Sequence, residues 1–444
     1  MSSHFILRIK NVFFHQSNME RFQRLGKEFF WIILGQAFSM AGAIIGVRIL
    51  TEFLPPKIYG ELALGITITT FVGQIVMGPL GAGPGRFFAA ARENNELGSF
   101  LKGIKKLILK TTGIILLFAF LIVLFLIIIN KKDWIGLIMA AFCFALLSGY
   151  NSILNSMQVA ARQRLIVAWH QALATWARFI FACGMIIWFG SKSSIAMLGY
   201  SLAILMVLIS QYWFFRRKIL INNKSYCLNS SHIWEDKMLS FSWPFATWGI
   251  FTWAQSASDR WALQKFASTK DVGIYSVLYQ LGYYPITVFI DLTTQLLQPI
   301  FYQRVGDASD KTRLKNIHEL NRKIVIFSLF LTFIGVFFAL FFNKQIFKYL
   351  VAEDYRQISW LLPGMVMASG FFATAQIAAI YLLSDKDSKS LILPKIGSSI
   401  IGIILNISGA FLFGVKGVVG SCIIFSIIYL VWVLYAIRIK NKLL

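Results

Sequence analysis

The sequence predicts an all-α polytopic membrane protein with about 12 transmembrane helices, in two six-helix lobes related by a parallel repeat. The first observation is the composition, because 57% of the 444 residues are hydrophobic and only 14% are charged. Soluble domains carry roughly 25% charged and about 45–50% apolar residues, so this chain has more apolar surface than one core can bury. The other two observations are the length of the apolar segments and the placement of the basic residues.

Each apolar segment is tested against the thickness of a bilayer. A helix that crosses roughly 30 Å of hydrocarbon at 1.5 Å per residue needs about 20 mainly apolar residues. Twelve segments qualify, with approximate limits 28–50, 60–81, 105–129, 134–158, 165–189, 195–215, 239–263, 272–301, 323–342, 357–383, 391–413 and 417–437. Polar stripes in 239–263 and 272–301 favour helix faces that line a cavity.

The basic residues predict the orientation of these spans. The net charge is +24; 30 of the 43 Lys and Arg residues fall in pieces placed on the cytoplasmic side, and ten in pieces placed outside. This bias in short loops follows the positive-inside rule. Because both ends are basic, we expect an even number of spans and both termini in the cytoplasm. This topology accounts for the positive charge without a nucleic-acid partner.

The longest polar linker divides the chain into two halves. We expect a cytoplasmic amphipathic segment over 1–27, an N-lobe over 28–215, a cytoplasmic linker over 216–238, a C-lobe over 239–438 and a cytoplasmic tail over 439–444. Each lobe then contains six spans.

The two halves resemble each other where their first two spans meet. Aligned on Gly60 and Gly273, they match at Leu50/Leu263, Phe53/Phe266 and Lys57/Lys270. Six spans per half give both halves the same orientation, so the repeat axis lies along the membrane normal. Transporters of this design place the substrate route between the halves.

Ionisable side chains within a span are costly, roughly 2.5–3.5 kcal/mol each on insertion scales, and so mark candidate functional sites. Arg178 lies in the middle of the fifth span, and His170 lies eight residues earlier, about 80° away on a helix. The two predict a cationic patch for an anionic substrate. The alternative is structural, with Arg178 paired to an acid or to carbonyl groups and His170 at the membrane interface.

Asp259 and Arg260 follow a polar stripe in the seventh span that includes Gln255. Neighbouring residues point about 100° apart on a helix, so we expect one of the two to line the substrate route with Gln255. The alternative is a salt bridge at the outer end of the span.

Three further sites remain open between two interpretations. Arg48 has Glu52 at i+4, which predicts either an exposed ion pair or a cavity-lining cation. Asp291 in the eighth span is a candidate for proton coupling or a counter-ion. Asn151 and Asn155 share a helix face and would bind sugar hydroxyls or neighbouring helices.

Several stretches resemble the polysaccharide and O-antigen flippases, which belong to the multidrug/oligosaccharidyl-lipid/polysaccharide exporter superfamily. They are RILT (48–51) with YGELAL (59–64), GAG (81–83) before RFF (86–88), and Asp259-Arg260 followed by DVGIYS (271–276). The resemblance implies two lobes around a central cavity. It also implies alternating access that moves an undecaprenyl-pyrophosphate-linked oligosaccharide from the cytoplasmic to the outer leaflet of the bacterial inner membrane, driven by an ion gradient.

On this interpretation the arginines Arg48, Arg178 and Arg260 would bind the pyrophosphate, because the planar fork of Arg donates paired hydrogen bonds. Asn151, Asn155 and Gln255 complete the candidate substrate site, and Asp259, Asp291 and His170 are candidates for coupling or charge balance. The substrate, membrane lipids, an H+ or Na+ gradient and polysaccharide assembly proteins are the expected partners of a monomer.

Two other classes of protein remain to be compared with a flippase. An ion-coupled drug or organic-cation antiporter of the same fold needs an unpaired acidic group in its cavity, whereas the spans here carry at least as many arginines as acids. A membrane-embedded glycosyltransferase would need catalytic groups in a large outer loop, and the longest predicted one is 343–357. No Walker sequence, nucleophile elbow or metal pattern is present, so we expect a transporter without a cofactor or metal rather than an enzyme.

Overall fold

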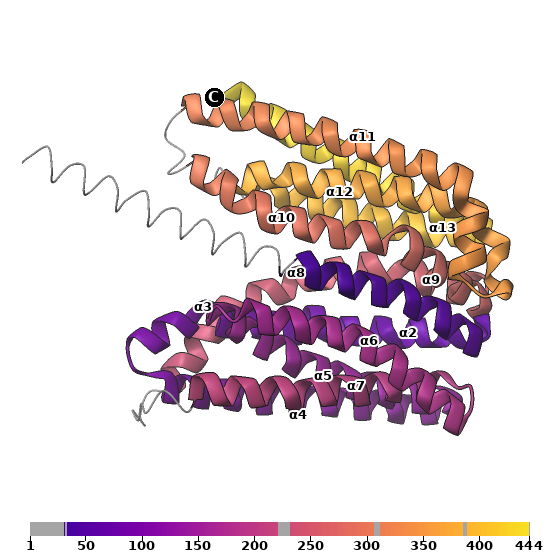
Figure 1. The fold of residues 1–444 in the computed structure, drawn as a ribbon, viewed down its shortest axis with the longest axis horizontal. Coiled ribbons are helices and arrows are strands. Elements are labelled where there is room, and N and C mark those ends of the chain that lie inside the picture. The colour runs from indigo at the N-terminus through magenta and orange to yellow at the C-terminus, as the bar shows by residue number, and fades with distance from the viewer. Residues whose placement is uncertain (1–30, 32, 221–230, 306–310, 385–388, 444) are drawn as a thin grey trace, which may run out of the picture.

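The computed structural model describes residues 31, 33–220, 231–305, 311–384 and 389–443, and these form helices with no strand among them (Figure 1). A first helix covers Ile33–Phe53. The N-terminal half continues with α2 (Pro56–Val72), η1 (Gly73–Met77), α3 (Gly78–Glu93), α4 (Leu97–Ile128), η2 (Lys132–Trp134), α5 (Ile135–Ala160), α6 (Arg164–Phe189), α7 (Ser193–Phe215) and η3 (Arg216–Leu220). The C-terminal half contains α8 (Ser231–Phe266), α9 (Thr269–Gly282), α10 (Tyr284–Val305), α11 (Lys311–Leu350), η4 (Glu353–Leu361), α12 (Leu362–Ser384), η5 (Lys389–Leu391) and α13 (Ile392–Leu443).

Nine helical stretches in the described part of the chain are long and apolar enough to cross a membrane. The prediction of an all-α, multi-pass membrane protein is therefore confirmed, while the count of twelve spans stays a prediction. The predicted span 239–263 corresponds to α8, and the predicted span 272–301 corresponds to α9 together with α10. Because of their polar stripes, these helices are not among the nine apolar stretches. Two more merge in α13, where the backbone leaves the helical conformation at Gly414 (φ 57°, ψ −133°).

Several helices extend beyond the predicted spans, and the predicted segment 1–27 lies outside the described residues. Helix α8 begins at Ser231, eight residues before the predicted start of the seventh span at 239. The π-helical segment η3 extends the sixth span to Leu220. Both extensions are amphipathic and charged, so a search for apolar segments does not detect them as helices.

The helices form two bundles that lie one above the other in Figure 1. Helices α3–α7 form the lower bundle and α10–α13 the upper one. The most lipid-exposed helices are α4 and α11, since the apolar windows of their spans are only 11% and 17% buried. These two helices occupy the third position of their respective halves, as a repeat of the two halves requires.

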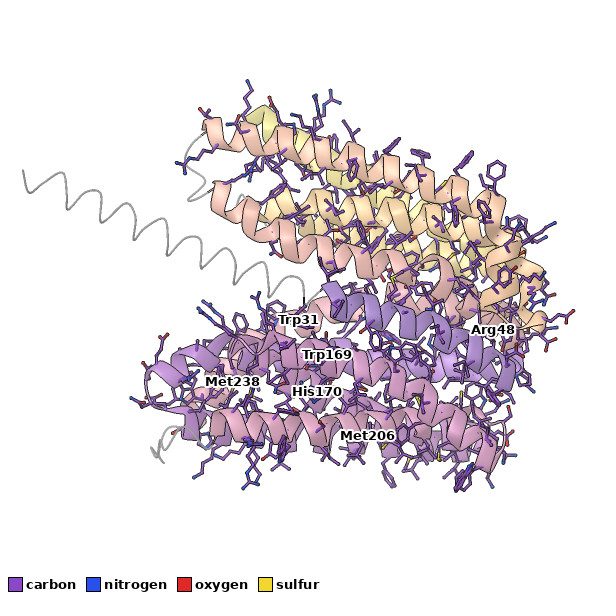
Figure 2. All side chains as sticks on the ribbon, in the orientation of Figure 1. Trp31, Arg48, Trp169, His170, Met206 and Met238 are labelled. Carbon is purple, nitrogen blue, oxygen red and sulfur yellow. The ribbon has the colours of Figure 1, made fainter. Side chains whose placement is uncertain are left out.

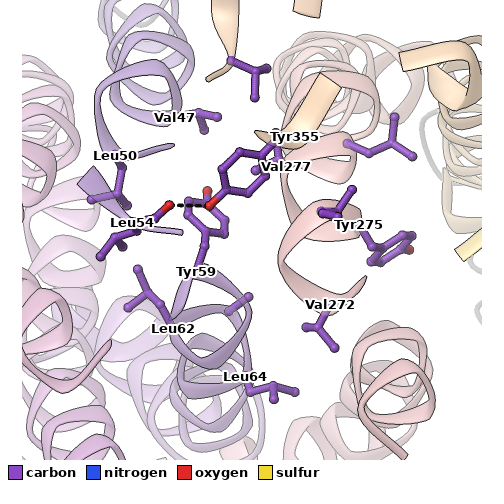
Figure 3. Close-up of a cluster of buried hydrophobic side chains, with 14 of the residues drawn as sticks. Val47, Leu50, Leu54, Tyr59, Leu62, Leu64, Val272, Tyr275, Val277 and Tyr355 are labelled. Carbon is purple, nitrogen blue, oxygen red and sulfur yellow. Dashed lines mark hydrogen bonds between the residues drawn. The ribbon is translucent and has the colours of Figure 1, made fainter. Parts of the chain in front are cut away.

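The halves meet in what we call the closed end, formed by Thr51, Leu54, Gly60, Gly273 and Tyr355. Figure 3 shows Leu54 and Tyr355 in this contact. The Tyr355 hydroxyl donates to the Leu54 carbonyl at 2.6 Å, and the Ala352 amide donates to the Thr51 hydroxyl at 3.2 Å. Tyr355 is fully buried, and its ring packs edge-on against Tyr59. These contacts close one end of the molecule across the two halves.

The helices α2 and α9 cross at the two glycines that align in the repeat. A Cβ atom at Gly60 would collide with the Thr269 carbonyl oxygen, and one at Gly273 would collide with the Pro56 carbonyl oxygen. The contact is reciprocal, because each glycine packs against the backbone of the helix that carries the other one. A two-fold axis between Gly60 and Gly273 explains this geometry, and only glycine allows the two backbones to approach so closely.

Gly60→Ala is therefore expected to weaken the closed end. The added methyl group meets backbone atoms, which cannot rotate away, so the helices must separate at a cost of roughly 1–3 kcal/mol. The measurement is the thermal unfolding midpoint of the purified protein. Gly113→Ala is the matched control, because nothing lies within 4 Å of a Cβ atom there. An equal loss in both variants would contradict this account of the crossing.

Candidate functional site

A buried charge pair in the C-terminal half is Asp259–Arg260 of α8. Asp259 is 3% exposed, and the Arg260 guanidinium lies 3.2 Å from its Oδ1 atom. The Tyr275 hydroxyl donates to Asp259 Oδ2 at 2.7 Å. The Arg260 guanidinium also stacks over the Tyr279 ring, 4.5 Å from its centroid. The charge pair is therefore held by two tyrosines of α9.

The pairing of Asp259 with Arg260 differs from the expectation that only one of them faces the inside. Their Cα–Cβ bonds do diverge, but the long Arg260 side chain folds back, and its guanidinium also donates to the Ser256 carbonyl at 3.2 Å. Tyr275 contacts both residues, since its ring lies 5.8 Å from the guanidinium. The salt bridge that the sequence left as an alternative is present.

Arg178 in α6 has no acidic partner among the described residues. Its guanidinium lies 5.9 Å from the centroid of the Tyr200 ring of α7. The buried Nε atom of Arg178 has no hydrogen-bond partner in the part of the chain that the structure describes. An intramembrane cation without a described acidic partner retains most of its capacity to bind an anion.

His170 lies in the same bundle, as Figure 2 shows, but its ring is engaged in helix contacts. Nδ1 lies 2.7 Å from the Ile166 carbonyl oxygen, and Nε2 lies 3.2 Å from the Ser210 hydroxyl of α7. His170 is 7% exposed, whereas its neighbour Trp169 is 50% exposed. The buried His170 ring therefore packs against α7, and its placement at the membrane interface stays a prediction.

Tyr59 connects the surroundings of the two central arginines. It lies within electrostatic range of Tyr200, which stacks with Arg178, and of Arg260. Arg48 lies closer to the closed end (Figure 2), where it pairs with Glu52 at 2.6 Å. That i,i+4 pair is partly exposed, and its Arg48 Nη1 atom is buried without a hydrogen-bond partner among the residues that the structure places.

The asparagines Asn151 and Asn155 belong to an amide cluster between α5 and α7. Asn151 donates to Gln211 Oε1 at 2.5 Å, and Asn155 donates to Asn151 Oδ1 at 3.2 Å. Gln211 in turn donates to Asn155 and to Gln158. These bonds match the helix-binding alternative, while a role in binding sugars stays a prediction.

Gln255 lines a pocket between α8, α12 and α13, as the polar stripe of α8 predicts. The pocket is narrow, about 60 Å³, and contains a cation, amides and hydroxyls. The polar lining residues are Thr252, Gln255, Gln376, Lys395, Ser398, Ser399 and Tyr429. Tyr429 donates to Gln376 at 3.0 Å.

Sequence reasoning missed Lys395, which was counted with the cytoplasmic cations of the preceding loop. The structure places it inside α13, where it reaches the pocket beside Gln255. Its position within the predicted span 391–413 was the available signal. Asp291 lies on α10, but its side chain is outside the described residues.

Helix α8 also carries a buried acid at its beginning. Glu235 is 3% exposed and pairs with two lysines of α4, Lys106 at 3.2 Å and Lys110 at 3.0 Å. Trp234 donates to Glu96 at 3.0 Å. These contacts attach the start of α8 to the N-terminal half, while its other end packs in the C-terminal half.

The Glu235 pairs predict a pH-dependent stability. Burial alone would raise the pKa of the Glu235 carboxyl, but hydrogen bonds and charges from Lys110 and Lys106 outweigh it and hold the pKa below the ordinary value of 4.5. A lowered pKa adds stability above the unfolded value, and this is lost as the pH falls through the folded value.

Glu235→Gln should therefore destabilise the protein by roughly 1–3 kcal/mol at pH 7, and the difference from wild type should shrink as the pH falls below about 4. Unfolding midpoints measured across that range give the result. Asp236→Asn, an exposed neighbour, is the control. A difference that is constant with pH would exclude the ion pairs as its cause.

In the described ranges, no group of three or more His, Cys, Asp and Glu side chains is placed to hold a metal ion. The buried polar groups instead form cation, amide and tyrosine sites within a multi-pass helical fold. This combination is that of a multi-pass membrane protein whose helices enclose polar and charged side chains.

The chain belongs to the family of polysaccharide biosynthesis proteins, whose model matches residues 25–305. No curated protein matches the sequence. Among solved structures, similar folds include an inward-facing multidrug resistance MATE family transporter of the MOP superfamily (TM-score 0.67, 13% identity, covering 92% of this chain and 96% of that one). Another is the lipid II flippase MurJ in an inward closed conformation (TM-score 0.67, 13% identity, 93% and 88% covered). An outward-facing MATE family transporter matches with a TM-score of 0.51, at 14% identity and with 92% and 95% covered. The chain therefore belongs to a family named for polysaccharide biosynthesis and has the fold of these membrane transporters.

Proposed function

We propose that the protein moves an undecaprenyl-pyrophosphate-linked oligosaccharide, such as an O-antigen repeat unit of lipopolysaccharide, from the cytoplasmic to the outer leaflet of a bacterial inner membrane. The observation that carries the proposal is the uncompensated cation Arg178. Three acids described in or beside the spans are occupied: Glu52 pairs with Arg48, Glu61 accepts from Ser193 at 2.7 Å, and Asp259 pairs with Arg260. The intramembrane charge therefore favours an anionic substrate.

The route of the substrate is proposed to lie between the N-lobe (28–215) and the C-lobe (239–438). Arg178 belongs to the first half, whereas Arg260 and Gln255 belong to the second. A pyrophosphate that bridges the halves would reach cations from both, and its sugars would meet the amides and hydroxyls of the Gln255 pocket. The Arg48–Glu52 pair would meet the substrate nearer the closed end.

The closed end is proposed to face the outside, with both termini in the cytoplasm. Supporting this, the opposite end carries most of the basic residues, as the positive-inside rule requires. The two solved structures with a TM-score of 0.67 are in an inward-facing and an inward closed conformation, and the outward-facing one gives 0.51. Alternating access would break the Tyr355–Leu54 hydrogen bond to open the closed end, with an H+ or Na+ gradient as the driving force.

The experiment that tests this function uses a bacterial strain that lacks its own O-antigen flippase. Expression of this protein should restore polymer on the cell surface and should leave the ethidium resistance of a pump-deficient strain unchanged. Ethidium resistance without surface polymer would favour the organic-cation antiporter instead. That alternative has the same fold in its favour, but it lacks a described unpaired acid near Arg178.

A further inference from the structure

A second cationic cavity lies at the opposite end of the N-terminal half, away from the proposed route. It has a volume of about 560 Å³ and collects residues from α3, the α5–α6 turn, α7 and η3. The lining residues are Arg92, Ala161, Gln163, Phe214, Arg217, Lys218 and Ile219. We call it the basic pocket.

The basic pocket concentrates positive charge from separate elements. Arg92 comes from the last turn of α3, and Arg217 and Lys218 come from the π-helical segment η3. None of the described lining residues is acidic. Three cations around one cavity, with no acid in its lining, produce a field that an anion with more than one charge neutralises best.

Two features prepare the pocket for a ligand. The Arg217 guanidinium lies 5.3 Å from the centroid of the Trp213 ring. This cation–π contact holds the guanidinium at the wall of the basic pocket. The Gln163 amide oxygen is buried and has no hydrogen-bond partner among the described residues. Buried polar groups are rarely left unpaired, and rotation of this amide would direct its NH2 group toward an anion.

The surroundings indicate that the anion belongs to a lipid. Trp213 is 51% exposed, and Ile209, one turn earlier, is 63% exposed. On a membrane helix such residues face acyl chains, so the pocket opens beside the lipid surface at the level where headgroups lie. Basic pockets between transmembrane helices bind phosphate headgroups by this geometry.

We propose that the basic pocket binds the phosphate group of an anionic phospholipid. This site is separate from Arg178 and Arg260, so the lipid proposal does not depend on the substrate proposed above. Arg92, Arg217 and Lys218 contact the phosphate, Gln163 donates a hydrogen bond to it, and Phe214 with Ile219 packs against the glycerol and the start of the acyl chains.

The test measures phosphatidylglycerol binding to the purified full-length protein in nanodiscs by native mass spectrometry. The variant Arg92→Gln/Lys218→Gln should bind about 30-fold more weakly, because each cation near a headgroup contributes about a fivefold factor. The control Lys102→Gln/Lys105→Gln removes the same charge from exposed residues of α4 and should change binding less than threefold.

A second arm identifies the source of the phosphate. Inorganic pyrophosphate, titrated against the lipid, should displace it only at millimolar concentration if the acyl chains contribute. Tight pyrophosphate binding that is lost in the pocket variant would still place a phosphate at this site, but a soluble one. An equal loss in both double variants, or no loss in either, would overturn the proposal, because binding would then follow overall charge or another surface.

Discussion

Arg178→Ala is expected to reduce glycan export roughly 10- to 100-fold while the protein reaches the membrane at normal levels. A hydrogen bond to a charged group contributes about 1.5–3 kcal/mol, and the Arg178 guanidinium makes no ion pair with a described residue that would be lost instead. Removing it should therefore affect substrate binding more than folding. Surface polymer per unit of membrane protein is the quantity to measure.

Two further variants make the Arg178 result specific. Arg178→Lys keeps the charge but not the planar fork, so it should restore export only in part. Arg304→Ala removes an exposed arginine from the end of α10 and should leave export within twofold of wild type. Normal export by Arg178→Ala at normal membrane levels would remove the main support for this anion site.

Asp259→Asn is expected to have the largest effect on stability, about 3–5 kcal/mol. The substitution leaves Arg260 buried with its charge unbalanced, and an arginine cannot lose its proton to compensate. It also weakens the acceptor of the Tyr275 hydroxyl, which now bonds at 2.7 Å. The unfolding midpoint of the purified protein measures this loss.

The double variant Asp259→Asn/Arg260→Gln separates a structural role of Asp259 from a coupling role. If the carboxylate only balances Arg260, the double variant should regain most of the lost stability and should transport as well as Arg260→Gln alone. If Asp259 carries a coupling proton, the double variant should fold but should transport less than Arg260→Gln alone in the presence of an ion gradient. Stability that falls further in the double variant than in the single one would contradict the charge-pair account.

The membrane fold could be predicted from the sequence because the bilayer imposes a length and a composition on each span. The repeat was also detectable, since Gly60 and Gly273 occupy equivalent positions and the structure places them in reciprocal contact. The start of α8 at Ser231 was missed because that turn is stabilised by packing on α4, through Glu235 and its lysines, rather than by burial in lipid.

The candidate site was predicted less completely than the fold. The free-energy cost of an ionisable side chain within a span identified Arg178, Asp259 and Arg260 as unusual. It does not give their side-chain partners, because these depend on the neighbouring helices. The pairing of Asp259 with Tyr275, 16 residues later in the next helix, is a tertiary contact. Lys395 was missed because a lysine one turn into a span looks like part of the preceding basic loop.

The most direct test of the account is the flipping of a synthetic polyprenyl-pyrophosphate-linked oligosaccharide in proteoliposomes. The fraction of the sugar that becomes accessible to an impermeant oxidant should rise with wild-type protein and fall at least tenfold with Arg178→Ala. A neutral glycolipid with the same sugar should not be moved by either protein. Equal flipping of the charged and neutral lipids, or transport of ethidium in place of both, would contradict the claim that this transporter recognises an anionic lipid-linked sugar.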